Sequence, residues 1–550
     1  MLFRKKGKTH MNKQRSILLI ILPYLTWSKE AKNNNNTRSV LAFPYGILSI
    51  ASYIKAKAAK NPSVGILDLN LYAAEEISGA ISQALKKNKP DIVGMSMMFD
   101  SSYKSLNRIS KQIKDYDDKI TVVLGGSAAT VSWDKILHEQ EYVDAICYGE
   151  GEYPLRHLVE ADNISETLDK NPVWVTRKSL AKNLKPQPRY VDNLNEVINV
   201  NYELIDVGSY SMKEAFSPFS SVKESRDVRQ FFLVTSRGCP FRCVFCSGSS
   251  LHGKNIRCAD VSVLIGHVRY LVEKYKMNVL TIYDDQILFY RDRAKEFFRK
   301  LAEFNLRVET PNGLSVAFID EEMAMLMKRA GIDTVPLAIE SGSKHMLNEV
   351  IHKPLRLEQV KPVVDILHRN NIFVQGYFVV GIPGEQEEDR IETARFIKEV
   401  GLDWAGFNLA TPLRGSELYK ICIENGYIDP NFGIGDLGMH DYVINAPGLN
   451  PVDIKRKRYL MNLDVNFVNN HRMKVGDYEI AILCFKDVIA RYENHAFAYY
   501  YLARALSAVN KNNQQIEQVL DKMKEVMNIE SVWKEYFEHF GIDYMEEVKN

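Results

Sequence analysis

The chain has 550 residues, of which 46% are hydrophobic and 25% are charged, with 71 Lys and Arg against 69 Asp and Glu. This length suggests several domains of about 100–200 residues each, and the composition excludes a largely disordered chain. Because the charges nearly balance, nothing indicates a nucleic-acid partner, and we expect none.

An apolar run, ILLIIL at residues 17–22, precedes Pro23 and is far shorter than the roughly 20 residues that cross a bilayer. We expect a buried strand here and no membrane span. The basic residues upstream could mimic the head of a signal peptide, but no small-residue cleavage site follows, so we expect 1–15 to be a flexible tail. The seven cysteines form an odd set without regular pairing, which is typical of a reduced, cytoplasmic protein.

Residues 16–161 alternate short apolar runs with segments of helical period. The expected strands are 16–22, 64–69, 91–98, 120–126 and 143–149. Strict alternation predicts a doubly wound, Rossmann-like parallel sheet, which binds ligands at the carboxyl ends of its strands. Glycines follow two of these strands, at 125–126 and at 149 and 151, although they could equally serve only tight turns.

Residues 162–228 carry several prolines and less regular patterning, so we expect a connector with a few short strands. Alternation resumes over 229–448. The expected strands there are 231–236, 278–285, 306–311, 333–341, 372–381 and 404–412. Six strand–helix units are fewer than the eight of a closed barrel, which predicts a partial (β/α)6 barrel with its reactive groups at the strand C-termini.

Residues 449–550 carry helical patterns only and complete an α/β chain with an α-helical C-terminal domain. One stretch, 476–510, resembles a tetratricopeptide-type helix pair. This domain could bind a protein partner, or it could simply cover the barrel.

Three cysteines, Cys239, Cys243 and Cys246, follow the first barrel strand as C-x3-C-x2-C. A structural zinc site needs four ligands and usually shows two C-x2-C pairs, although Cys258 could in principle supply a fourth ligand. Three thiolates on a [4Fe–4S] cluster would instead leave one iron without a protein ligand. That iron could bind a substrate or a cosubstrate.

This spacing, with the aromatic Phe245 before the third cysteine, resembles the radical S-adenosylmethionine superfamily. The resemblance implies that the open iron binds the amino and carboxylate groups of S-adenosylmethionine. An electron donor such as flavodoxin or ferredoxin would supply the electron that cleaves it to methionine and a 5′-deoxyadenosyl radical.

Further motifs match the superfamily in order. In "LAIESGS", the resemblance assigns Glu340, Ser341 and Ser343 to the methionyl and ribose parts of the cosubstrate. In "VVGIPGE", it assigns Gly381 and Ile382 to the adenine. The glycine-glycine-glutamate motif of many members is missing from this chain.

At the end of the second barrel strand, "TIYDDQ" offers Tyr283, Asp284 and Asp285. We expect these three side chains to orient substrate. They could equally be a capped strand end.

The N-terminal segments "FPYGILSIASYIK", "VGMSMM", "VVLGGSAAT" and "YGEGEYPLRHL" resemble the cobalamin-binding domain of the cobalamin-dependent radical S-adenosylmethionine enzymes. The expected cobalamin-binding residues are Tyr45, Ser96, Met98, Gly125, Gly126, Ser127, Gly149 and Glu150.

Many cobalamin domains ligate cobalt through the histidine of a D-x-H-x-x-G motif, but no histidine occurs here between Met11 and Leu137. The corrin should therefore bind without a protein histidine, over an apolar floor of Met97, Met98 and Phe99. The alternative is a domain that has lost cobalamin.

The resemblance implies a methyltransferase that acts on an unactivated carbon of a small-molecule, lipid or peptide substrate. Cyclisation or rearrangement with the same cofactors, and an inactive scaffold that acts through its helical domain, are the alternatives. Methylthiolating relatives carry three further N-terminal cysteines, whereas this N-terminal half has only Cys147, so transfer-RNA methylthiolation is a poor match.

Overall fold

The computed structural model describes residues 14–24, 42–210, 228–429, 431–436, 441–509 and 513–544. The chain divides into two compact units, Met1–Ser211 with Phe432–Gly438 and Met212–Asn431 with Met439–Asn550. The helical C-terminal residues therefore belong to the same unit as the barrel. The finer boundaries expected at 161, 228 and 448 stay predictions.

The first unit contains one six-stranded sheet with strand order β2-β1-β3-β4-β5-β6. The strands are β1 (Ser16–Ile21), β2 (Ser63–Asp68), β3 (Ile92–Ser96), β4 (Thr121–Gly125), β5 (Ala145–Cys147) and β6 (Trp174–Val175). The five strands expected from the sequence are confirmed and run parallel, while β6 lies in the expected connector and pairs antiparallel with β5. The direction of winding reverses between β1 and β3, which is where sheets of this type bind ligands.

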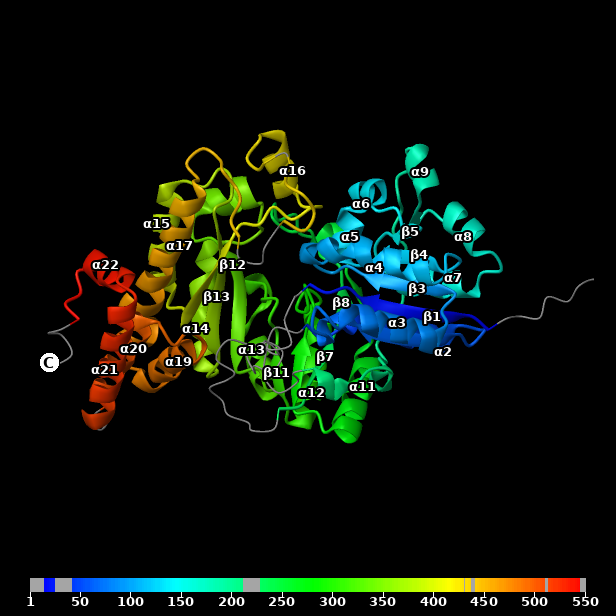
Figure 1. Ribbon diagram of the computed structural model, residues 1–550. Helices are drawn as coiled ribbons and strands as arrows, with labels where there is room; N and C mark the ends of the chain where they lie inside the picture. The colour runs from blue at the N-terminus through cyan, green and yellow to red at the C-terminus, as the bar shows by residue number, and fades with distance from the viewer. Residues whose placement is uncertain are drawn as a thin grey trace, which may run out of the picture. The chain divides into compact units, whose positions relative to one another are not determined.

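Helices cover both faces of this sheet (Figure 1). They are α2 (Tyr45–Lys57), α3 (Ile77–Asn88), α4 (Tyr103–Tyr116), α5 (Ser127–Val131), α6 (Trp133–Glu139), α7 (Glu152–Glu160), α8 (Ile164–Lys170) and α9 (Arg177–Ala181). Leu18 and Ile20 of β1 pack in one core with α3 and α4, whereas Ile17 and Leu19 pack in another with α2 and α7. A strand buried on both faces explains the unbroken apolar run and confirms the doubly wound architecture.

The second unit contains six parallel strands in two groups of three. They are β7 (Gln230–Leu233), β10 (Val279–Ile282), β11 (Arg307–Glu309), β12 (Thr334–Glu340), β13 (Phe373–Val380) and β14 (Trp404–Leu409). A parallel bridge between Leu314 and Leu337 joins the two groups. The six strands expected from the sequence are thus confirmed as a partial barrel.

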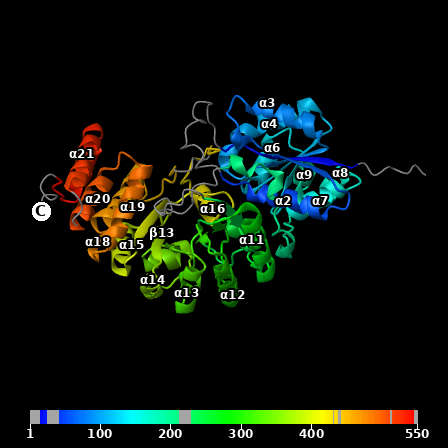
Figure 2. The same cartoon turned by 90° about the horizontal axis from the view of Figure 1, so that it is seen from below.

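Five helices follow the barrel strands, and Figure 2 shows them as an arc in chain order on the outside. They are α11 (Val261–Tyr275), α12 (Arg291–Leu301), α13 (Glu321–Arg329), α14 (Val360–Arg369) and α15 (Glu387–Val400). A shorter helix, α16 (Glu417–Glu424), comes after β14. None of the helices in the described ranges is both long enough and apolar enough to span a membrane.

The C-terminal helices lie beside β14, the last strand. They are α17 (Pro451–Leu463), the π-helical turn η12 (Asp464–Val468), α18 (His471–Lys474), α19 (Tyr478–Arg491), α20 (Ala496–Ala508), α21 (Asn513–Ile529) and α22 (Val532–His539). They share a core rich in aromatic residues, including Phe467, Phe485 and Phe497. Asn466 of η12 accepts from the N–H of Ala405 and donates to its carbonyl, both at 2.8 Å, and so closes the open edge of β14.

Candidate functional site

The three-cysteine loop begins directly after β7 and is held by main-chain hydrogen bonds. Gly238 adopts a φ of +102°, and a side chain there would lie 2.3 Å from the Asn255 carbonyl oxygen. Only glycine fits at this turn. The N–H of Cys239 donates to Gly253 at 3.1 Å, and that of Val244 donates to Ile351 at 3.0 Å. The loop is therefore anchored on both sides of its cysteines.

The three thiols lie on the accessible side of this loop. Cys239 and Cys243 are half-buried and Cys246 is exposed, while Val244 between them is buried. The N–H of Gly248 donates to Cys246 Sγ at 3.3 Å, a contact that stabilises a thiolate. Phe245 is half-buried beside them.

Two opposite charges lie beside the thiols. Glu340, at the end of β12, accepts from Lys353 Nζ at 3.0 Å, and both side chains are nearly buried. Burial raises the pKa of Cys243 to about 11, while the Lys353 ammonium acts in the opposite direction. Glu340 adopts a φ of +71° at a break in the β12–β13 register, which turns it out of the regular strand. Sequence reasoning missed Lys353, because a single lysine thirteen residues after Glu340 carries no local signal.

The three thiols are a donor set that fits an iron–sulfur cluster, whose irons are bound by cysteine thiolates. In the described ranges, no three His, Cys, Asp or Glu side chains converge closely enough to hold one metal ion. Cys258, in the short strand β9 (Arg257–Cys258), pairs with Ser236 of β8 (Ser236–Arg237) and has Arg293 and Asp284 as its charged neighbours. The structure therefore groups Cys258 with Asp284 and not with the three thiols.

Asp284, expected to orient substrate, is instead part of the support of the loop. Its carboxylate is 4% exposed and accepts from the Thr235 N–H, the Thr235 hydroxyl and the Ser236 hydroxyl at 2.5–2.6 Å. Burial raises its pKa, and these hydrogen bonds oppose that rise. A carboxylate with three donors around it positions β7 and β8 against β10. A contact of Asp284 with substrate stays a prediction.

Tyr283 and Asp285, the two neighbours of Asp284, are more exposed than Asp284. Asp285 is only half-buried, and its charge acts on Cys239 and Cys246, so it lies on the cluster side. Tyr283 is half-buried and stacks on Phe232, with ring centroids 5.2 Å apart and 2° between the planes. These two positions stay candidates for contacts with substrate.

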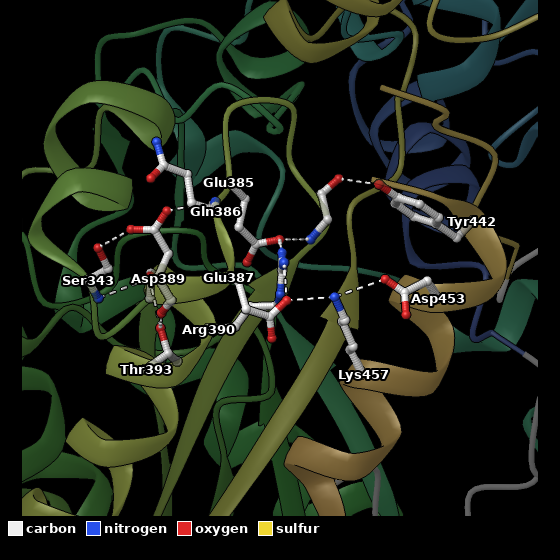
Figure 3. A network of polar contacts seen from close by, with 12 residues as sticks. Ser343, Glu385, Gln386, Glu387, Asp389, Arg390, Thr393, Tyr442, Asp453 and Lys457 are labelled. Carbon is white, nitrogen blue, oxygen red and sulfur yellow. Dashed lines mark hydrogen bonds and ion pairs between the residues drawn. The ribbon is translucent and has the colours of Figure 1, made fainter. Parts of the chain in front are cut away.

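The two serines of "LAIESGS" form hydrogen bonds with side chains of α15, as Figure 3 shows for Ser343. Ser343 is 0% exposed and its hydroxyl donates to Asp389 at 2.5 Å, while Ser341 Oγ lies 3.1 Å from the hydroxyl of Thr393. Asp389 also lies 3.1 Å from His345. The two serines thus fix the turn after β12, and of the three expected cosubstrate residues only Glu340 lies beside the cysteines.

The glycine turn after β13 is held in the same way (Figure 3). Gly381 donates its N–H to Glu385 at 2.6 Å and accepts from the Tyr442 hydroxyl at 2.7 Å. Its φ is +90°, and a side chain there would meet the Tyr442 ring at 2.6 Å. Ile382 is 1% exposed, so its side chain is covered by protein. A contact of Gly381 or Ile382 with adenine would therefore involve main-chain atoms.

Glu385 belongs to an ion-pair network behind this turn. It pairs with Arg390 at 3.1 Å, and Arg390 also donates to Glu387 at 2.9 Å. Glu387 in turn pairs with Lys457 of α17 at 2.6 Å. Burial raises the pKa of Glu385 to about 7, against the opposing charge of Arg390. The network ties the β13 turn to α15 and to the C-terminal helices.

In the first unit, the expected cobalamin residues at the ends of β3 and β4 form a partly exposed edge. Ser96, Gly125, Gly126 and Ser127 are all partly exposed, and Met98 is 39% exposed. Gly126 has a φ of +104°, and a side chain there would lie 2.5 Å from the Met97 carbonyl oxygen. The loops after β3 and β4 can approach only because this residue is glycine. A small, accessible edge beside the winding reversal fits a cofactor that lies along it.

The remaining expected cobalamin residues differ in exposure. Tyr45 is buried at the start of α2, whereas Gly149 is partly exposed beside Pro188. Glu150 is 6% exposed and accepts from the Val191 N–H at 2.7 Å, so it ties down the connector, and its contact with cobalamin stays a prediction. Met97 lies in the core at 0% exposure, which leaves Met98 and Phe99 to form an apolar surface.

Comparison with known proteins adds to these observations. Residues 233–397 match the family model described as the radical SAM superfamily, and residues 34–159 match the B12 binding domain.

Two curated relatives are both named as methyltransferases. The chain is 26% identical over 447 residues to a cytidylyl-2-hydroxyethylphosphonate methyltransferase of Streptomyces wedmorensis, covering 74% of this chain and 83% of that protein. It is 29% identical over 387 residues to an uncharacterized methyltransferase of Pyrococcus horikoshii, covering 70% and 79%.

A solved structure shares the fold. The radical S-adenosylmethionine methyltransferase TsrM of Kitasatospora setae, with cobalamin and a [4Fe–4S] cluster bound, aligns at a TM-score of 0.61 and 13% identity. The alignment covers 94% of this chain and 100% of that chain.

Proposed function

We propose that this cobalamin-dependent radical S-adenosylmethionine enzyme methylates an unactivated carbon atom of a small-molecule, lipid or peptide substrate, as its likeness to curated methyltransferases supports. Its cofactors are a [4Fe–4S] cluster, S-adenosylmethionine and cobalamin. When bound, the cluster supplies the electron that cleaves S-adenosylmethionine, and cobalamin carries the methyl group. The proposed electron donor is a small carrier such as flavodoxin or ferredoxin.

The observation that carries this proposal is the Glu340–Lys353 pair beside the three thiols. Cys239, Cys243 and Cys246 hold the cluster. Near them lie one anionic and one cationic side chain, which match the ammonium and carboxylate groups of S-adenosylmethionine in charge. In this role Glu340 accepts from the ammonium and Lys353 donates to the carboxylate, in a surrounding where burial strengthens both contacts.

Buried polar side chains hold the loops around this centre in place. Asp284 fixes the approach to the cysteine loop, and the Asp389 and Glu385 networks fix the turns after β12 and β13. In the first unit, the edge formed by Ser96, Met98, Gly125 and Ser127 holds cobalamin. Rigid supports of this kind keep reacting groups in a productive geometry.

The test is anaerobic reconstitution of the protein with iron, sulfide and cobalamin, followed by a metabolite screen with mass spectrometry. We expect 5′-deoxyadenosine from S-adenosylmethionine and a product heavier than its substrate by one CH2 group. A product of unchanged mass would point to cyclisation or rearrangement. No cleavage of S-adenosylmethionine would point to an inactive scaffold.

The Cys243→Ala variant should lose the cluster and all cleavage, as iron content and 5′-deoxyadenosine yield report. The matched control is Cys258→Ala, because Cys258 lies with Asp284 and away from the three thiols. It should keep both properties. Loss of the cluster in Cys258→Ala would instead make Cys258 a fourth ligand and contradict the open iron.

A further inference from the structure

The inner face of the barrel carries a pattern that the cofactors do not explain. Along β13, Val374, Gly376, Phe378 and Val380 are buried. Tyr377 and Val379, which alternate with the last three of them, are only partly buried. The same alternation on β14 leaves Gly406 partly exposed and Asn408 exposed. These strands therefore present an accessible inner surface.

Gln375 lies on this inner surface with its amide oxygen unsatisfied. The residue is 4% exposed, and Oε1 has no hydrogen-bond partner among the described residues. A buried carbonyl without a donor is unfavourable, so such an atom indicates a partner that arrives from outside the chain. The amide belongs to the inner face, because its nitrogen lies 3.5 Å from the position of a side chain at Gly406.

Tyr377 extends the same surface, two residues further along β13. Its ring lies 3.3 Å from the side-chain position of Gly406 and 3.4 Å from that of Gly313. Neither glycine has a side chain, and Ala338, which lies beside Gly313, is small and partly exposed. These small residues leave space beside the ring. Burial raises the pKa of Tyr377, so its hydroxyl stays a neutral donor.

The charges on the inner face cancel. Among the inward positions of the six strands, the cation is Arg307, and its Nε lies 3.3 Å from Glu309 Oε1. At the C-terminal end of β12, Glu340 pairs with Lys353. A charged group brought next to Gln375 and Tyr377 would lose hydration, and the charges of Arg307 and Lys353 are already paired with Glu309 and Glu340. Arg307 Nε and Nη2 still lack a hydrogen-bond partner among the described residues, so the benzoate probe tests whether this guanidinium binds an anion.

We propose that Gln375 and Tyr377 bind an uncharged, hydrogen-bonding group of the substrate, such as an amide or a ring-borne N–H or hydroxyl, and so orient it on the inner face of the barrel. This inference rests on the proposed function, because it assigns the substrate of that same site. It deepens the function by selecting polar, neutral substrates over anionic or purely apolar ones.

The experiment measures binding of three probes that share one ring: benzamide, benzoate and ethylbenzene. Saturation-transfer NMR on the reconstituted holoenzyme should show the strongest transfer for benzamide. Gln375→Leu should weaken the benzamide signal by about two- to tenfold, which is the loss expected for one hydrogen bond. Tyr377→Phe, which keeps the ring and its packing, should weaken it in the same direction. Gln359→Leu, an exposed glutamine on η11 (Leu357–Gln359), is the matched control and should behave as the wild type.

Equal transfer from the three probes would overturn the inference. So would a benzamide signal that Gln375→Leu leaves unchanged, because Gln375 would then hold a structural water only. Cleavage of S-adenosylmethionine by the same wild-type preparation reports separately on the proposed function. A preparation that binds benzamide through Gln375 but cleaves nothing would contradict the function and leave the binding surface in place.

Discussion

Asp284 and Asp285 are adjacent in the sequence, yet their surroundings give them different tasks. Three donors surround the Asp284 carboxylate. Among the described residues no hydrogen bond engages that of Asp285, which acts through its charge on two of the thiols. Two chemically identical side chains thus have different roles here because their burial and their neighbours differ.

Asp284→Asn should destabilise the protein by about 1–3 kcal/mol, because an amide can no longer accept from all three donors and one buried group loses its partner. The midpoint of thermal unfolding measures this effect. Cluster content should fall with stability, while cleavage of S-adenosylmethionine per bound cluster should stay within a few-fold of the wild type. Full loss of turnover in a stable variant with an intact cluster would instead make Asp284 a catalytic residue.

Glu385 should make stability depend on pH. Its pKa of about 7 in the folded protein lies above the ordinary 4.5, so the folded state binds more protons than the unfolded state between these values. The stabilisation is therefore complete below about pH 4.5 and is lost as the pH rises through 7.

Glu385→Gln should flatten that dependence, by up to about 3 kcal/mol between the two ends. Thermal unfolding of both proteins at a series of pH values between 5 and 8 tests it. Glu392→Gln, on the exposed side of the same helix α15, is the control and should keep the wild-type slope. A Glu385→Gln profile parallel to the wild type would show that Glu385 does not titrate in this range.

At the scale of elements, the partial barrel has an open edge that the chain closes with a helix. A strand with unpaired N–H and C=O groups invites pairing with another chain. In β14, Ala405 is 0% exposed, and both of its outward main-chain groups bond the side chain of Asn466. A single amide thus takes the place of a neighbouring strand at this position.

Asn466→Ala should destabilise the protein by about 2–4 kcal/mol, since it leaves two buried main-chain groups unsatisfied. Unfolding midpoints and size-exclusion chromatography measure the loss and any association through the freed edge. Asn469→Ala is the matched control, because the Asn469 side-chain amide donates to the Asp464 carboxylate and not to a main-chain group of β14. Equal effects in the two variants would refute the edge-closing role of Asn466.

At the scale of the whole molecule, the two units bring different cofactors to one reaction. The thiols and the Glu340–Lys353 pair belong to the second unit, and the exposed edge of β3 and β4 belongs to the first. Cleavage of S-adenosylmethionine and delivery of the methyl group should therefore be separable.

Omission of cobalamin from the reconstitution should leave 5′-deoxyadenosine formation measurable and abolish the methylated product. The comparison is between cobalamin-free and cobalamin-loaded samples with equal iron content. Methylated product at full yield without cobalamin would show that the first unit does not carry the methyl group.

The order and type of the main strands follow from local patterns in the sequence. Unbroken apolar runs such as 17–22 and the alternation with helical segments depend on local periodicity, so all eleven expected strands could be read from the chain, as could the three thiols on one loop. A two-residue strand such as β6 could not, because so short a run carries no period.

Only the tertiary structure decided which candidate side chains are accessible. Ser341, Ser343, Asp284 and Glu150 were plausible ligands in the sequence, but distant partners such as Thr393, Asp389, Thr235 and Val191 engage them. Two further candidates, Lys353 and Gln375, are identified only by the structure. Lys353 forms an ion pair beside the thiols, and Gln375 has an unsatisfied side-chain oxygen. Hydrogen bonding and burial depend on residues far apart in the chain, and no local pattern records which of them the fold brings together.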